Sequence, residues 1–174
     1  MNQETLNNYF GKIWQVDYSK FNLTGFELLR LLNPEEKILD VGCGYNLFKP
    51  HLGDNLWGID PANDCADEIV SIEDFEPKEV YDAALCLGSL NFGSRDVVFG
   101  QTAKVVSCIK TGGYIYWRQN PGLSDHPWKE VDDIKFYPWT FRDNLDMAEL
   151  LGCTVERLQW DTGNRIFAVW KKVV

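Results

Sequence analysis

A short apolar strand that runs directly into a glycine turn is the feature that most constrains the fold of this chain. The strand covers residues 37–41, and Gly42 and Gly44 follow it at once. Glycine lets the backbone turn tightly and leaves room for a ligand where a Cβ would intrude. This pattern predicts a buried parallel strand with a binding loop at its carboxyl end.

A second strand, at residues 56–60, ends in Asp60, which stands twenty positions after Asp40. An acid at this distance from a glycine turn suits the two hydroxyls of a ribose, because a carboxylate can accept a hydrogen bond from each of them. Strand, turn and spaced acid together predict a cleft for a nucleoside-bearing cofactor at the carboxyl ends of a parallel sheet.

The glycine turn departs from the dinucleotide pattern GxGxxG, since Leu47 occupies the position of the third glycine. Residues 40–46 (DVGCGYN) and 58–61 (GIDP) instead resemble class I S-adenosylmethionine-dependent methyltransferases. The order of the elements is similar to that family over about residues 20–172, and residues 86–93 also resemble small methyltransferase-like proteins of bacterial viruses. The resemblance implies S-adenosylmethionine as the cofactor. A nicotinamide-dependent dehydrogenase stays open as an alternative.

The length of 174 residues suits one domain. We expect a single domain over residues 1–174, with residues 1–20 as an N-terminal helical arm or lid and residues 21–174 as the core. The sequence contains no apolar run of about eighteen residues and no signal-peptide pattern at its start, so no membrane span is expected. Its five cysteines are never closely paired, which argues against a zinc or other metal site and indicates a cytoplasmic protein.

The net charge of −9 makes nucleic acid an unlikely partner. A duplex-binding face needs clustered lysine and arginine to neutralise phosphates, and the basic residues of this chain are scattered. A small or basic substrate fits this charge better. The oligomeric state cannot be read from the sequence.

The hydrophobic pattern alternates strand and helix, which is typical of a parallel α/β sheet. Strands are expected at 37–41, 56–60, 68–71, 81–86 and 114–119, followed by a closing hairpin of 155–160 and 166–170. Helices or arms are expected at 3–18, 24–32, 48–52, 94–109 and 140–151. The second of these begins with a capping-box match, Thr24 with Glu27. The predicted fold class is a single-domain, Rossmann-like α/β methyltransferase fold, with a mostly parallel sheet and an antiparallel C-terminal hairpin strand.

The resemblance assigns roles to residues of the two turns. In the family, the acid at the position of Asp40 helps to hold the methionine end of the cofactor, and the acid at Asp60 takes the ribose hydroxyls. Plain structural roles are the alternatives: a helix-capping acid for Asp40 and a strand-ending turn at Asp60. The predicted cofactor-binding residues are Asp40, Gly42, Cys43, Gly44, Asp60, Ile72, Glu73 and Leu87.

The adenine contact departs from the family pattern. Members often carry an aspartate after the third strand to accept a hydrogen bond from the adenine amino group, whereas residues 71–74 read Ser-Ile-Glu-Asp. Ser71, Glu73 or Asp74 would then hold the adenine, with Ile72 offering its backbone N–H. Asn46 stands where many members have a third glycine, and asparagine tolerates left-handed backbone better than most residues.

The loop after the fourth predicted strand excludes one group of substrates. Residues 86–92 carry neither the Asn/Asp-Pro-Pro-Tyr/Phe motif of amino-group DNA methyltransferases nor a Pro-Cys nucleophile, so nucleobase modification is disfavoured. The candidate substrate-binding residues are Asn91, Arg118, Asn120 and His126. Arg118 would pair a substrate carboxylate or phosphate, or else an acid of the protein. His126 is either a base near neutral pH or a surface residue.

The sequence therefore predicts an S-adenosylmethionine-dependent methyltransferase that acts on a small-molecule or peptidic acceptor. Methyl transfer is an in-line displacement in which alignment can supply much of the acceleration, and no catalytic residue is identified. The N-terminal aromatic residues Tyr9, Trp14 and Tyr18 either close over the cofactor or simply pack. A non-catalytic S-adenosylmethionine-binding or interaction protein of the same fold is the alternative.

Overall fold

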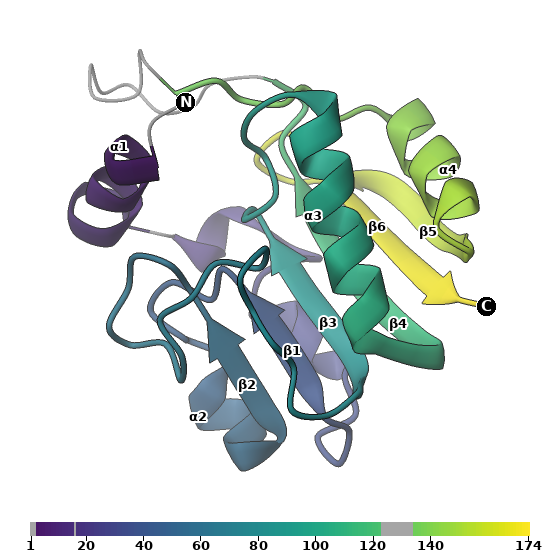
Figure 1. Ribbon diagram of the computed structural model, residues 1–174, viewed down its shortest axis with the longest axis horizontal. Helices are drawn as coiled ribbons and strands as arrows, with labels where there is room; N and C mark the ends of the chain where they lie inside the picture. Colours follow the sequence, from purple (N-terminus) through teal and green to yellow (C-terminus); the bar gives the residue numbers. More distant parts are fainter. Residues whose placement is uncertain (1–2, 16, 123–133) are drawn as a thin grey trace.

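The computed structural model describes residues 3–15, 17–122 and 134–174. Its centre is a six-stranded sheet in the order β2-β1-β3-β4-β6-β5 (Figure 1). The strands are β1 (Ile38–Val41), β2 (Leu56–Ile59), β3 (Tyr81–Leu87), β4 (Ile109–Gln119), β5 (Cys153–Asp161) and β6 (Arg165–Lys172). The first four strands are parallel, and β6 runs antiparallel to both of its neighbours, as predicted.

Helices cover both faces of this sheet. The helical segments are α1 (Gln3–Asn8), η1 (Tyr9–Ile13), η2 (Tyr18–Lys20), η3 (Phe26–Arg30), α2 (Lys49–Leu52), η4 (Gly53–Asn55), α3 (Arg95–Cys108) and α4 (Phe141–Leu150). The side chains of α3 and α4 pack into one hydrophobic cluster, and those of η3 and α2 pack into a second cluster on the opposite face. Figure 1 shows α1 apart from these layers, beside the edge at which β1, β2 and β3 end.

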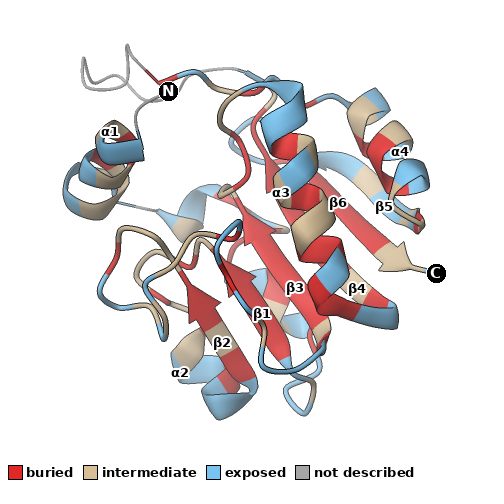
Figure 2. Ribbon diagram, in the orientation of Figure 1, coloured by how far each residue is buried: buried red, intermediate tan, exposed pale blue. Residues whose placement is uncertain are grey.

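The buried residues follow the strands, which explains the apolar runs in the sequence (Figure 2). All four residues of β1 are buried, because helices lie on both faces of a parallel sheet. The ring of Trp117 in β4 packs at 4.8 Å from that of Trp170 in β6, and its centroid lies 6.1 Å from that of Trp139. Trp139 is 1% exposed, so it belongs to the core.

Two helix starts agree with the sequence patterns. Ser94 caps α3 by accepting a hydrogen bond from the Val97 amide. Thr140 and Asp143 form the reciprocal capping box at the start of α4. The N-terminal segment, by contrast, is divided between α1 and the π-helical turn η1 rather than forming one helix.

The strand predicted at 68–71 is wrong, since only one parallel bridge forms there, between Ile59 and Glu68. Backbone hydrogen bonds join residues 67–70 to residues 58–60, and the carboxylate of Asp67 adds a side-chain contact by accepting a hydrogen bond of 2.8 Å from the amide of Gly58 in β2. Lys49 holds the same carboxylate at 2.8 Å. The strand expected at 114–119 begins five residues earlier, at Ile109.

The helix predicted at 24–32 is reduced to the short 3-10 helix η3, and its predicted capping box does not form. The hydroxyl of Thr24 instead donates to the carboxylate of Asp161, at the far end of β5. That carboxylate also accepts hydrogen bonds from the backbone amides of Asn22, Leu23 and Thr24, at 3.0–3.1 Å. Asp161 therefore ties the segment before η3 to the C-terminal hairpin.

Candidate functional site

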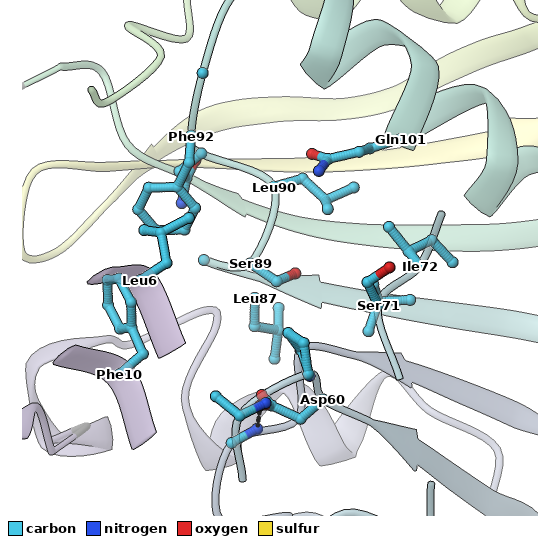
Figure 3. Close-up of a pocket in the computed structure, with 18 of the residues that line it drawn as sticks. Leu6, Phe10, Asp60, Ser71, Ile72, Leu87, Ser89, Leu90, Phe92 and Gln101 are labelled. Carbon is cyan, nitrogen blue, oxygen red and sulfur yellow. Dashed lines mark hydrogen bonds between the residues drawn. The ribbon is translucent and has the colours of Figure 1, made fainter. Parts of the chain in front are cut away.

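A cavity of about 710 Å³ opens at the carboxyl ends of β1, β2 and β3. The lining comes from the N-terminal helical segment, the turns after β1 and β2, residues 70–73 and the loop after β3, together with Phe21, α3, the end of β4, residues 135–136 and the start of β6. Figure 3 shows Asp60, Leu87 and Ser89 between two walls, with Leu6 and Phe10 on one side and Ser71, Ile72 and Gln101 on the other. The volume lies in the usual range for small-molecule and cofactor sites.

The two glycines of the turn after β1 have different structural roles. Both have positive φ, +68° at Gly42 and +54° at Gly44. A Cβ at Gly42 would lie 2.3 Å from the Cβ of Ser89, so this glycine lets the loop after β3 approach β1. A Cβ at Gly44 would meet no atom of the described residues within 4 Å, and Gly44 lines the cavity. Gly44 therefore leaves open space on the cavity side.

Asp60 lies directly beside this opening. One carboxylate oxygen accepts a hydrogen bond from the Gly44 amide at 3.0 Å, and the other accepts from the amides of Ala62 and Asn63 at 2.8 and 2.9 Å. These contacts orient the carboxylate and hold the two turns together. An ionised carboxylate has about four acceptor positions, so Asp60 retains capacity for a ligand hydroxyl.

The far wall of the cavity contains Ser71, Ile72 and Glu73, whereas Asp74 does not line it. The Ser71 hydroxyl donates to the Asp74 carboxylate at 2.9 Å, and the Glu73 carboxylate accepts from the side-chain amide of Gln101 in α3. Gln101 also lines the cavity. No local pattern in the sequence identifies Gln101, because the packing of α3 over this loop brings it there.

The loop after β3 supplies Leu87, as predicted, and also Ser89, which the sequence reading missed. The Ser89 hydroxyl is buried and finds no hydrogen-bond partner among the described residues. Buried hydroxyls without a partner are uncommon and costly, so this one suits a ligand contact. The available signal was a hydroxyl residue two positions after the end of β3, in the loop that faces the cofactor in the family.

Asp40 and Cys43 were also predicted at the cofactor, but neither lines the cavity. Both are buried. The pKa of Asp40 is raised to about 7: burial is the largest cause, Arg118 opposes it, and the neighbouring carboxylates of Asp60 and Asp67 add to the rise. Burial likewise raises the pKa of the Cys43 thiol, which disfavours a reactive thiolate.

Arg118 is buried at the cavity and is held by main-chain carbonyls. Its guanidinium donates to the carbonyl oxygens of Thr24 at 3.1 Å and Leu87 at 2.6 Å, and it lies 4.1 Å from the ring centroid of Phe21. Burial lowers the pKa of Arg118 to about 10, so the group stays charged at neutral pH. The structure thus places a fixed positive charge beside the end of β3.

Asn91 and Asn120 line the cavity next to Arg118, and both are buried. The side-chain oxygen of Asn91 accepts from the backbone amide of Asn120, and that of Asn120 accepts from the amide of Gly122, each at 3.0 Å. The fold therefore brings together three of the four predicted substrate residues. His126 lies outside the described residues.

The described part of the chain contains no group of three or more His, Cys, Asp or Glu residues arranged to hold a metal ion. In the same ranges, no helix combines the length and the apolar composition needed to cross a lipid bilayer.

No protein-family model matches this chain, and no curated protein matches it by sequence. Solved structures match it over most of its length. Magnesium protoporphyrin IX methyltransferase from Synechocystis PCC 6803 with bound SAM has a TM-score of 0.69 and 11% identity, over 99% of this chain and 98% of that one. The N-methyltransferase NodS from Bradyrhizobium japonicum WM9, in complex with S-adenosyl-l-homocysteine, has a TM-score of 0.64 and 14% sequence identity, over 84% of each chain.

A third match is 1,6-didemethyltoxoflavin-N1-methyltransferase from Burkholderia thailandensis, with bound 1,6-didemethyltoxoflavin and S-adenosylhomocysteine. It has a TM-score of 0.63 and 13% identity, over 80% of this chain and 72% of that one. Identities this low establish a shared fold. The chain has the fold of class I S-adenosylmethionine-dependent methyltransferases, as its glycine turn and spaced acid predicted.

Proposed function

We propose that this protein is an S-adenosylmethionine-dependent methyltransferase that acts on a small-molecule or peptidic acceptor. The observation that carries the proposal is the open space at Gly44, beside the oriented carboxylate of Asp60, in a cavity at the carboxyl ends of the parallel strands. Three solved structures of the same fold hold S-adenosylmethionine or S-adenosylhomocysteine. The same proposal treats residues 1–174 as one domain, with residues 1–20 as an arm beside the site.

The residues present fit this cofactor. Asp60 would accept a hydrogen bond from a ribose hydroxyl, and the apolar side chain of Ile72 would contact the adenine. Glu73, together with Gln101, would supply polar contacts at the adenine edge, in place of the aspartate that the family often uses. The Ser89 hydroxyl, which has no partner among the described residues, would bind near the methionine end.

The cofactor supplies an activated methyl group on a sulfonium, which is passed to a nucleophilic atom while the carbon–sulfur bond breaks. The protein's part is alignment and exclusion of water. Leu6 and Phe10 line the cavity on the side of the N-terminal segment. Leu90 lies between Phe92 and Ile72 (Figure 3). A general base is needed only when the acceptor arrives protonated.

A matched pair of glycine substitutions tests the cofactor site. Gly44 and Gly53 have nearly equal φ, +54° and +61°, and a Cβ at either would meet no described atom within 4 Å. Alanine is strained at both positions, and Gly53, with a ψ of −143°, lies close to a region of backbone conformation that essentially only glycine adopts, so Gly53→Ala is a stringent control for backbone strain alone. Of the two, only Gly44 lines the cavity.

Calorimetric titration with S-adenosylhomocysteine should give micromolar affinity for the wild-type protein and for Gly53→Ala, and at least tenfold weaker binding for Gly44→Ala. Equal binding by both variants would place the cofactor elsewhere. Affinity for nicotinamide dinucleotides instead would favour a dehydrogenase.

Release of S-adenosylhomocysteine from S-adenosylmethionine in the presence of an acceptor would separate an enzyme from a non-catalytic binding protein. In a substrate screen, Gly44→Ala serves as the control for a contaminating activity.

A further inference from the structure

Four aromatic side chains form a continuous row along the cavity. Trp14, Phe10, Phe92 and Phe136 follow one another, with ring centroids 5.5, 5.1 and 5.4 Å apart. They come from the N-terminal segment, from the loop after β3 and from residue 136, which forms an isolated bridge with Phe92. All four line the cavity. Figure 3 shows Phe10 and Phe92 on the wall opposite Ser71 and Ile72.

This row differs from the aromatic residues of the core. Trp117, Trp139 and Trp170 are at most 1% exposed, whereas each member of the row is half-buried. Because all four residues line the cavity, part of their ring surface faces it, where another ring can pack in the offset or T-shaped arrangements that aromatic pairs prefer. The row is therefore a wall suited to a flat apolar group.

The described acidic and basic side chains that line the cavity lie in different parts of it. Its described acids, Asp60 and Glu73, belong to the parts already assigned to the ribose and the adenine. Its described bases, Arg118, Lys135 and Arg165, lie outside those parts, and Lys135 directly precedes Phe136 in the row. An aromatic wall can also hold a cationic ligand, but among the described lining residues this side has three basic side chains and no acid, which opposes a cation.

We infer that the methyl acceptor is a planar aromatic small molecule that carries an anionic group. Its ring packs against the row formed by Trp14, Phe10, Phe92 and Phe136, and its anionic group lies toward Lys135 and Arg118. This inference rests on the proposed function, because the cofactor is taken to fill the opposite half of the cavity. It narrows the acceptor from the wider small-molecule or peptidic class.

The test uses protein saturated with S-adenosylhomocysteine and three panels of probes. Hydroxybenzoates and aminobenzoates are compared with the matched benzamides, which lack the charge, and with the matched cyclohexanecarboxylates, which lack the aromatic ring. Binding is measured by calorimetry or ligand-detected NMR. We expect the benzoates to bind at least fivefold more tightly than either matched panel.

Two substitutions test which residues cause the tighter binding of benzoates. Phe92→Leu keeps an apolar side chain but removes a ring, and it should weaken benzoate binding about three- to tenfold, in line with the worth of an aromatic pair. Lys135→Gln should weaken binding of the benzoates while leaving the benzamides unchanged. Trp160→Leu is the matched control, because Trp160 is 58% exposed and does not line the cavity.

Equal binding of benzoates and cyclohexanecarboxylates would overturn the aromatic part, and equal binding of benzoates and benzamides would overturn the anionic part. Tighter binding of trimethylanilinium cations, or no binding of any benzoate by the loaded protein, would overturn the whole inference. These results leave the proposed cofactor use intact, since loading with S-adenosylhomocysteine is measured first. Failure of that loading would remove the proposed function itself.

Discussion

The buried carboxyl of Asp40 should make the stability of this protein fall as pH rises toward neutrality. The pKa of Asp40 is raised from an ordinary value of 3.8 to about 7, chiefly by burial and then by the neighbouring carboxylates. Between these two pH values the folded chain keeps a proton that the unfolded chain has lost. The stability contributed by this group is therefore complete below about pH 4 and is lost as pH rises through about 7.

The size of this effect follows from the width of the interval. Each tenfold change in proton affinity is worth about 1.4 kcal/mol, so a rise of three such steps amounts to about 4 kcal/mol. That is a large fraction of the 5–15 kcal/mol by which folded domains are typically stable. With a urea slope of about 2 kcal/mol per molar, it equals a midpoint shift of about 2 M.

The substitution Asp40→Asn removes the ionisation and keeps the shape. Urea unfolding of both proteins from pH 4.5 to pH 8 should show the difference in unfolding free energy, variant minus wild type, growing by about 3 kcal/mol with pH, since this range covers most of the interval. Because every other titrating group is present in both proteins, its contribution to the unfolding free energy cancels in this difference. A constant difference across this range would refute the reasoning, because Asp40 would then be ionised in the fold throughout.

Asp82→Asn supplies a control of opposite sign. The pKa of Asp82 is lowered by the ammonium of Lys110 and by the amide of Lys37. Its contribution is therefore present at neutral pH and is lost as pH falls below the ordinary range of the group. The destabilisation caused by Asp82→Asn should shrink, not grow, toward acid pH.

The remaining predictions concern three other polar contacts. Asp161→Ala should cost about 3 kcal/mol in urea unfolding and expose residues 22–24 to hydrogen exchange, because the lost carboxylate leaves several amides without an acceptor; unchanged protection there would contradict the tether. Asn144→Leu should cost about 2–4 kcal/mol by thermal melting, since Asn144 exchanges two hydrogen bonds with Gln119 and accepts a third from Trp170; a neutral result would show that the buried network contributes nothing. Asp60→Ala should weaken cofactor binding by about 1.5–3 kcal/mol in calorimetry. Since it also frees three backbone amides of the turn, Asp60→Asn is the companion variant: it should bind more weakly with a smaller loss of stability.

The parts of the fold that follow local rules could be predicted from the sequence. The capping residues Ser94 and Thr140 mark the starts of α3 and α4, and the glycine turn marks the end of β1. Each signal lies within a few residues of the structure that it specifies. The same holds for Asp60, which reaches the cavity because it directly follows a buried strand.

The missed features depend on contacts between distant segments. The capping box expected at Thr24 does not form, because the hydroxyl and the amide of Thr24 both donate to the carboxylate of Asp161 instead. No local sequence pattern connects these two residues. The strand expected at 68–71 is reduced to a single bridge, at which the Asp67 side chain also binds a backbone amide of β2. The meeting of Phe92 with Phe136 likewise appears only when the chain is folded.

The hydrogen bonds between Asp161 and residues 22–24 affect the order in which the parts of the cavity can form during synthesis. Thr24, whose carbonyl helps to hold Arg118, belongs to the segment that Asp161 secures, and Asp161 follows it by 137 residues. A ribosome-bound chain that has emerged only through α4 contains Gly44, Asp60 and Ser89 but lacks the hairpin that anchors this segment. Contacts of such long sequence separation form slowly. The contacts that hold Arg118 can therefore be completed only after the last hairpin has left the exit tunnel, later than the synthesis of the turns that carry Gly44 and Asp60.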